Sequence, residues 1–282
     1  MVKYKIIFLI LVCGLFSCEG DEFISAPKQI VVEGWIDSYG YPVVILTTTA
    51  PVETEKQNVS SISDYIVKWA KVTIDDGENQ VVLTGKVDED YFPPYIYTTG
   101  DMKGEVGKTY KLTIEYEDFY ATAETTIPPP VEIDSFTIKK IGGNSNSYSL
   151  TAHFKDDQTE KNYYNFFLNT ANSPYQSFSV VPYGLVNDEV VEDSIVSVPI
   201  HRDRMIIEWE NYQADFLFWE VVKLKFVQMD YEGFLVWKSF EELSTLSRNP
   251  LFPVTNGLHS NINGGLGYWL GYGASIYRIR IK

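Results

Sequence analysis

The sequence predicts a mainly β fold made of two β-sandwich-like domains, with one helix packed on the second. Three observations lead to this prediction: short runs in which apolar and polar residues alternate, turn-forming residues between those runs, and three consecutive prolines near the middle of the chain. Alternation with a period of two is typical of half-buried strands. Hydrophobic residues make up 45 % of the 282 residues, which is enough for a folded core and excludes a disordered chain.

The N-terminal domain is expected over residues 28–127, as an Ig-like or transthyretin-like sandwich of about seven short strands. Thr109–Tyr116 alternates most cleanly, with Tyr110, Leu112 and Ile114 on one face. The other expected strands are 29–36, 42–49, 69–74, 80–84 and 120–126.

The turn Asp75-Asp76-Gly77-Glu78-Asn79 lies between two of these strands. An Asp-Gly pair between alternating runs predicts the tip of a β-hairpin. The cluster of carboxylates also resembles a calcium loop, but it lacks the order Asp-x-Asp-x-Asp-Gly and the distal Glu of an EF-hand. We therefore expect a hairpin here and no metal site.

The prolines Pro128, Pro129 and Pro130 mark the expected domain boundary, because a proline run cannot join a strand ladder and favours an extended spacer. The second domain, 131–282, is expected to be a β-sandwich or open barrel. Its helix is expected near 231–247, where Val236, Phe240 and Leu243 follow helical spacing. The expected strands are 131–139, 148–154, 163–168, 176–181, 194–200, 205–212, 216–229 and 277–281.

The N-terminus has the pattern of a lipoprotein signal peptide, residues 1–17. Lys3 and Lys5 precede an apolar run that is too short to span a membrane, since a spanning helix needs roughly 20 apolar residues. Leu15-Phe16-Ser17-Cys18 then matches a bacterial lipobox. Cleavage before Cys18 and acylation with fatty chains such as palmitate would anchor the protein to a membrane, since stable anchoring takes at least two chains.

An acidic tether, residues 18–27, follows the lipobox and contains Glu19-Gly20-Asp21-Glu22. It is either a solvated linker or an export signal, because it resembles the acidic signals with which Bacteroidota lipoproteins reach the cell surface. The sequence thus predicts a lipid anchor at Cys18 that holds the protein to a membrane, and it is compatible with both the periplasmic and the exterior face.

The body carries no recognised set of catalytic residues, so we expect no enzyme and no cofactor. Its three histidines, His153, His201 and His259, have no metal-ligand spacing and are expected to be surface or structural residues. Both cysteines, Cys13 and Cys18, lie in the first 18 residues, which excludes a cysteine nucleophile or a disulfide framework from the body. An excess of 38 acidic over 23 basic residues argues against nucleic acid as a partner.

Glycines near the C-terminus, at 264, 265, 267, 271 and 273, precede a strand and are not followed by Lys-Ser/Thr. A phosphate cradle is therefore not expected, and the glycines are better explained by bulges or by close approach of two chain segments.

Two aromatic clusters are the remaining candidates for a binding site. Aromatic side chains on loops suit stacking on sugars, peptides or a protein partner, and they also fill β cores. The candidate ligand-binding residues are Tyr91, Phe92 and Tyr95 in the first cluster and Tyr268, Trp269 and Tyr272 in the second.

Several segments, taken in order, resemble the Bacteroidota outer-membrane lipoproteins catalogued as domain of unknown function 4249. One position departs from the family pattern, since Asp157 stands where the family often has proline. The resemblance covers nearly all of the chain after Cys18. It is carried by 28–36, 70–76, 107–114, 154–157 with 162–164, 249–252 and 260–267.

The resemblance implies an outer-membrane lipoprotein, commonly encoded beside a TonB-dependent receptor of the SusC-like type. It supplies no catalytic residues, and the only site residue it carries over is the acylated Cys18. We therefore expect a binding or accessory component of a TonB-dependent nutrient uptake system, with an unknown ligand. The alternative is a structural or adhesin-like surface lipoprotein without a transported ligand, and an envelope hydrolase is a distant third.

Overall fold

The computed structural model describes residues 28–49, 63–142, 146–170, 177–187, 195–202, 214–246 and 257–282. In these ranges the chain is mainly β, with several sheets and the single helix α2, so the predicted fold class is confirmed. The predicted signal peptide, the tether with Cys18 and the expected strand 205–212 lie outside the described residues.

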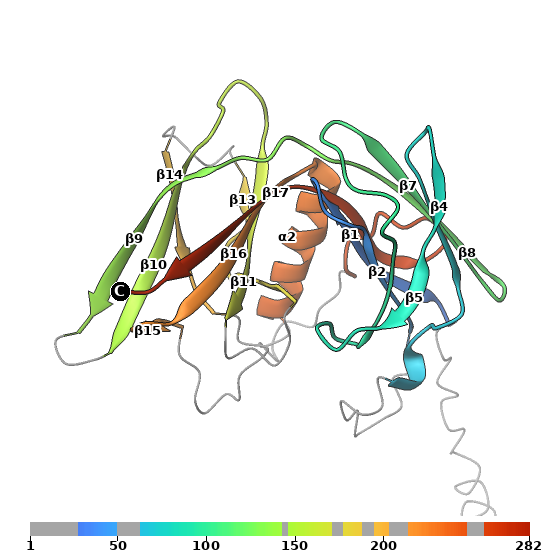
Figure 1. Cartoon of the computed structure of the whole chain (residues 1–282), viewed down its shortest axis with the longest axis horizontal. Coiled ribbons are helices and arrows are strands. Elements are labelled where there is room, and N and C mark those ends of the chain that lie inside the picture. The colour runs from blue at the N-terminus through green and yellow to red at the C-terminus, as the bar shows by residue number, and fades with distance from the viewer. Residues whose placement is uncertain are drawn as a thin grey trace, which may run out of the picture.

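The N-terminal part of the chain forms one sandwich (Figure 1). Apolar side chains alternate along its strands and meet between the two sheets, where Ile36, Val44 and Leu112 are fully buried. One sheet contains β1 (Ile30–Asp37), β2 (Val43–Thr48), β5 (Thr84–Val87) and β6 (Tyr95–Thr98), and the other contains β3 (Lys71–Asp75), β4 (Gln80–Val82), β7 (Thr109–Tyr116) and β8 (Phe119–Thr126).

The C-terminal part forms a second sandwich, whose core is rich in aromatic residues such as Phe154, Tyr164 and Phe226. Side chains from two separate sheets share this core, which is consistent with the expected β-sandwich. One sheet holds β9 (Ile133–Ile141), β10 (Ser147–Lys155), β14 (Ile195–Ile200) and β15 (Phe216–Leu217), and the other holds β11 (Tyr163–Thr170), β12 (Ser179–Val180), β13 (Val186–Asn187) and β16 (Val221–Met229).

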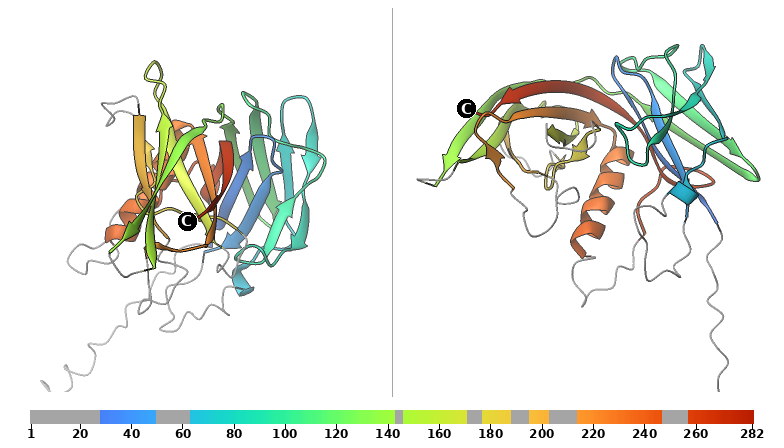
Figure 2. Two further views of the ribbon diagram at one scale, coloured as in Figure 1. Left: turned by 60° about the vertical axis from the view of Figure 1, so that its left-hand side comes forward. Right: turned by 60° about the horizontal axis from the view of Figure 1, so that its bottom comes forward.

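The last strand, β17 (Leu266–Arg280), belongs to both sandwiches. Its first seven residues pair in parallel with β1, and from Gly273 onward it pairs antiparallel with β16. Figures 1 and 2 show it as a long arc that runs across both lobes. One face of this strand places Trp269 in the N-terminal core and Ile279 in the C-terminal core. A single nine-stranded sheet therefore continues from one sandwich into the other.

The proline run crosses β17 where that strand has glycine. A Cβ atom at Gly273 would lie 2.5 Å from the carbonyl oxygens of both Pro128 and Pro129, closer than real Cβ contacts allow. The expectation that these glycines permit close chain approach is confirmed. Gly267 has φ 101°, and a Cβ there would overlap the carbonyl of Val32, so this position also requires glycine.

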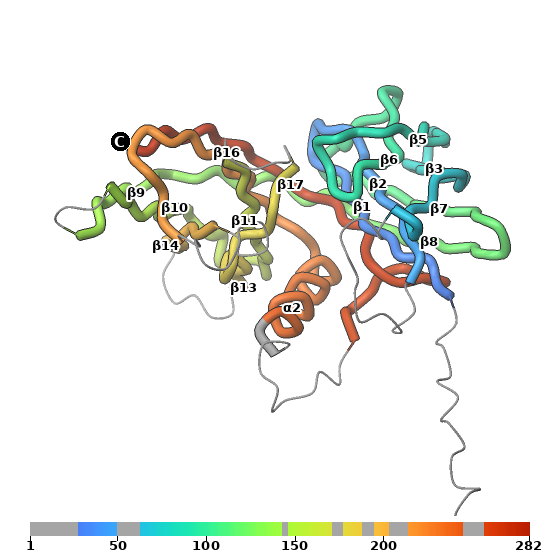
Figure 3. Tube along the Cα trace, turned by 90° about the horizontal axis from the view of Figure 1, so that it is seen from below, coloured from blue at the N-terminus to red at the C-terminus, as the bar shows by residue number. Residues whose placement is uncertain are grey.

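The predicted helix is α2, Tyr231–Leu246. Asp230 caps its first turn, because its Oδ1 accepts the backbone N–H of Gly233 at 2.8 Å. The apolar side chains Phe234, Val236 and Trp237 pack against β11 and β17. Figure 3 shows α2 beside the place where the two lobes meet.

The strand predictions differ from the structure in several places, among them the expected strand 80–84, which is divided between β4 and β5. The expected strand 216–229 is two strands, because Trp219 has φ 68° in a turn between β15 and β16. The last strand begins at Leu266 rather than near 277, since its glycines conceal the alternation. Residues 95–97, expected as a loop, belong to β6 and pair with β5.

Candidate functional site

A cluster of aromatic and charged side chains lies where β17 passes from its pairing with β1 to its pairing with β16, on the sheet face that also carries α2. We call it the seam cluster. Successive residues of a strand point to opposite faces, so the odd positions of β1 and the even positions of β17 share this face. The members of the seam cluster are Trp35, Asp37, Tyr91, Phe167, Lys225 and Tyr272.

Lys225 is the central residue of the seam cluster. Only 5 % of this lysine is exposed, and its Nζ lies 2.6 Å from Asp37 Oδ1. The same ammonium lies 4.9 Å from the ring centroid of Tyr272, 5.7 Å from that of Phe167 and 6.0 Å from that of Trp35. Burying an ammonium is costly unless a counter-charge and polarisable rings replace its water, and this site supplies both.

Helix α2 holds the rings of the seam cluster in place. The indole Nε1 of Trp237 donates a hydrogen bond to the Tyr272 hydroxyl at 2.9 Å, and the Trp237 ring packs edge-on against Phe167. Burial raises the pKa of Tyr272 well above its ordinary value, so its phenol stays protonated at neutral pH.

The loop that carries Tyr91 closes the other side of the seam cluster. Tyr91 is half-buried, and its ring centroid lies 6.2 Å from that of Trp35. Burial raises the pKa of Tyr91, and the carboxylates of Asp88 and Asp37 raise it further. The carbonyl of Asp90 accepts the backbone N–H of Ser177 at 2.8 Å, so this loop links the two sandwiches.

The other predicted residues of the first aromatic cluster lie apart from Lys225. Tyr95 packs against the N-terminal core and donates its hydroxyl hydrogen to the carbonyl of Lys68 at 2.8 Å. Phe92 is 38 % exposed and stays a candidate for ligand contact.

The second predicted cluster divides between the two faces of β17. Trp269 has no exposed surface; it lies in the N-terminal core, and its Nε1 donates to the carbonyl of Tyr110 at 3.0 Å. A side chain enclosed in this way offers no surface to a ligand. Tyr268, on the opposite face, donates to Glu33 Oε1 at 2.9 Å and lies beside Trp237.

Sequence reasoning named Tyr91 and Tyr272 but missed the four residues that bring them together. Trp35 packs against both Tyr91 and the apolar cluster that contains Tyr272. The available signal was Lys225, one of two lysines in the apolar-rich strand β16. Its partner, Asp37, lies 188 positions away in the chain, so the pairing has no local pattern.

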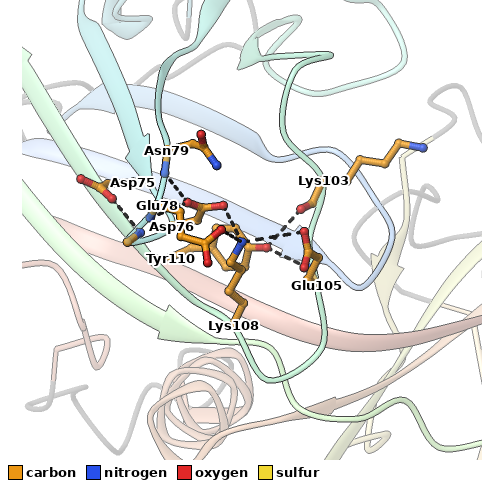
Figure 4. Close-up of polar contacts among 9 residues, drawn as sticks. Asp75, Asp76, Glu78, Asn79, Lys103, Glu105, Lys108 and Tyr110 are labelled. Carbon is orange, nitrogen blue, oxygen red and sulfur yellow. Dashed lines mark hydrogen bonds and ion pairs between the residues drawn. The ribbon is translucent and has the colours of Figure 1, made fainter.

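The turn at Asp75–Asn79 is a hairpin tip, as predicted, with Gly77 at φ 86° between β3 and β4. Asp76 accepts the backbone N–H groups of Glu78 and Asn79, and it accepts a hydrogen bond from Lys108 Nζ at 2.8 Å (Figure 4). The hydrogen bond from Lys108 lowers the pKa of Asp76 to about 2, helped by the two N–H groups. The cation held by these carboxylates is thus the protein's own lysine.

Two of the histidines take part in structural hydrogen bonds. His153 lies between Thr137 Oγ1 at 2.8 Å and Ser197 Oγ at 2.7 Å, on the polar face of β10. His259 Nε2 lies 2.9 Å from Glu232 at the start of α2. In the part of the chain that the structure describes, no three His, Cys, Asp or Glu side chains come together in a way that could hold a metal ion.

The fold and the seam cluster together define the class of protein. It is a mainly β protein of two sandwiches that share one strand, and aromatic rings surround a buried ion pair where the two sandwiches meet. No helix in the described ranges is long and apolar enough to cross a membrane.

The sequence matches the family model described as domain of unknown function (DUF4249) over residues 16–278, so the chain belongs to this family. A search of curated proteins found no match.

Proposed function

We propose that the protein is an outer-membrane lipoprotein without catalytic activity, anchored through acyl chains on Cys18. It acts as a binding or accessory component of a TonB-dependent nutrient uptake system. Two observations support the anchor and the partner: the lipobox Leu15-Phe16-Ser17-Cys18, and the resemblance to a family commonly encoded beside such receptors.

The seam cluster is the observation that carries the binding role. Ligand sites in proteins are lined mainly by apolar and aromatic side chains with a few convergent polar groups, and they are frequent where two domains meet. The seam cluster has this composition at this position, since aromatic rings surround the Asp37–Lys225 pair between two sandwiches. The half-buried Tyr91 gives it an accessible edge.

The anchor is tested by growing the producing bacterium with an alkyne-bearing palmitate analogue and comparing two cysteine variants of the full chain. Cys18→Ser is expected to lose the label and to leave the membrane fraction, because the acylated thiol is gone. Cys13→Ser is the matched control and keeps the label, since it alters a cysteine inside the predicted signal peptide. Equal labelling of the two variants would contradict anchoring at Cys18.

The partner is tested by affinity purification of the full chain, tagged after Lys282, from native outer membranes. Mass spectrometry of the eluate is expected to show one TonB-dependent receptor in stoichiometric amount. Cys18→Ser, which removes the anchor, serves as the background control. Recovery of the lipoprotein without a receptor would contradict the uptake role and favour the structural or adhesin-like alternative.

A further inference from the structure

Basic residues gather on one face of a strongly acidic protein. The chain has a formal net charge of −15, yet Lys223 on β16 and Arg278 and Arg280 on β17 are exposed together. Lys223 stands directly opposite Arg278 in the ladder, and Arg280 lies two residues further along the same face. We call these three residues with Trp219 the basic face.

The charges of the basic face are not neutralised by the described protein. Within the ranges that the structure covers, the side chains of Lys223 and Arg278 make no ion pair or hydrogen bond. Like charges directly opposite each other destabilise a sheet pair. An anion bound between them would remove this repulsion, so the arrangement favours a negatively charged ligand.

Trp219 adds a flat aromatic surface beside these cations. It is 59 % exposed, and the Arg280 guanidinium carbon lies 5.6 Å from its ring centroid. Its backbone has φ 68° at the third position of a turn closed by the Glu220 N–H on the carbonyl of Leu217. This position normally favours glycine. Trp219 thus combines a strained backbone with a side chain that is mostly exposed to solvent. This combination points to contact with another molecule.

We propose that the basic face binds an acidic saccharide. A sugar ring stacks on the Trp219 indole, and carboxylate or sulfate groups of the saccharide pair with Arg280, Arg278 and Lys223. The guanidinium groups suit planar carboxylates and sulfates because they donate two parallel hydrogen bonds. The three cations, spaced along and across two strands, match a chain that carries several charges.

The position of the basic face favours a saccharide over a lipid headgroup, and this choice rests on the proposed anchor. β17 runs parallel to β1 with Val31 opposite Leu266, so Arg280 lies 14 residues further along the strand direction. At about 3.3 Å per residue this is roughly 45 Å from the start of β1, where the tether enters. Figure 1 shows the C-terminal end at the opposite side of the molecule from the N-terminal sandwich.

The test uses the full-length chain in detergent, titrated by calorimetry with polygalacturonate, dextran sulfate and neutral dextran. One or both acidic polymers are expected to bind and dextran is not. The affinity should fall as NaCl rises, since salt screens exposed charges. The net negative charge of the protein repels polyanions, so binding of an acidic polymer indicates a local basic site.

Two variants locate the site. Trp219→Gly removes the ring, and glycine suits φ 68°, so the melting temperature is retained while the affinity falls about tenfold or more. Lys223→Gln with Arg278→Gln is expected to weaken binding more than tenfold. The matched double control, Lys68→Gln with Lys155→Gln, removes two exposed charges outside this face and leaves the affinity unchanged.

Three results would overturn the proposal. The first is no binding of either acidic polymer at low salt, and the second is equal weakening by the two double variants. The third is binding to vesicles that contain phosphatidylglycerol, lost in Trp219→Gly, without binding to the saccharides. None of these results alters the labelling at Cys18 or the recovery of a receptor. The proposed function is therefore tested independently of the saccharide site.

Discussion

Two aspartate–lysine pairs in this protein hold their lysines in different ways. At the hairpin tip, Lys108 lies among the carboxylates of Asp76, Glu78 and Glu105, within a few tens of residues along the chain. In the seam cluster, Lys225 has one carboxylate, Asp37, from a strand 188 positions earlier, and aromatic rings replace the other counter-charges. The first pair fixes a local turn, whereas the second joins the two sandwiches.

The comparison teaches that the surroundings of an ion pair decide how much the protein depends on it. At the hairpin tip the more buried partner is the aspartate, which also accepts two backbone N–H groups, and Lys108 has two further carboxylates nearby. In the seam cluster the more buried partner is the lysine, and a buried lysine that loses its one carboxylate stays uncompensated. The following variants test that difference in order of expected effect.

Asp37→Ala is expected to have the largest effect, a loss of about 3 kcal/mol or more in the free energy of unfolding, because it leaves the Lys225 ammonium buried without a counter-charge. The shift of the urea midpoint measures this loss.

The double variant Asp37→Leu with Lys225→Met is the control for this effect, since it removes both charges and keeps apolar volume. It should recover most of the loss. If Asp37→Ala is as stable as the unmodified chain, the seam pair does not hold the sandwiches together.

Asp76→Asn should cost less, on the order of 1 kcal/mol, because the asparagine oxygen can still accept the two backbone N–H groups and Lys108 keeps Glu78 and Glu105 as counter-charges. Thermal unfolding of this variant beside Asp37→Ala gives the ranking directly. The comparison fails if Asp76→Asn is the more damaging of the two changes.

The contribution of Asp76 should also depend on pH. Its pKa is lowered from 3.8 to about 2 in the folded protein, so its stabilising effect is complete above about pH 4 and is lost as the pH falls through 2. The difference in urea midpoint between the unmodified chain and Asp76→Asn should therefore shrink between pH 5 and pH 2. A difference that stays constant over this range would contradict the assignment.

Lys71→Met is expected to cause the smallest loss in the free energy of unfolding among these variants. Lys71 pairs with Glu115 at 2.6 Å, a distance equal to that of the seam pair, but both side chains are largely exposed. We expect a change within about 0.5 kcal/mol, close to the resolution of a urea titration. A clearly larger loss would show that distance, rather than burial, decides the strength of these pairs.

Much of the fold could be predicted because its causes are local. The alternation in Thr109–Tyr116 and the helical spacing of Val236 and Phe240 directly report which side chains are buried, and the Asp-Gly turn defines its own hairpin. The boundaries of β7 and of α2 agree with the sequence to within one residue.

The parts that could not be predicted depend on contacts between distant segments. The pairing of β1 with β17 joins the two ends of the body, and neither strand carries a pattern that names the other. Trp269 and Tyr272 stand three residues apart in the same aromatic run, yet one fills the N-terminal core and the other the seam cluster. Their separation follows from the face of β17 on which each lies.

The sharing of β17 has a consequence for how the protein is made. Synthesis proceeds from the N-terminus, so the edge of β1 stays unpaired and the place of Trp269 in the core stays empty until β17 has been made. Pairings between the ends of a chain form slowly, and an open strand edge invites association with other chains. A chain cut short before Leu266 would lack the strand that pairs with both β1 and β16. Neither sandwich can therefore complete its fold before β17 has been synthesised.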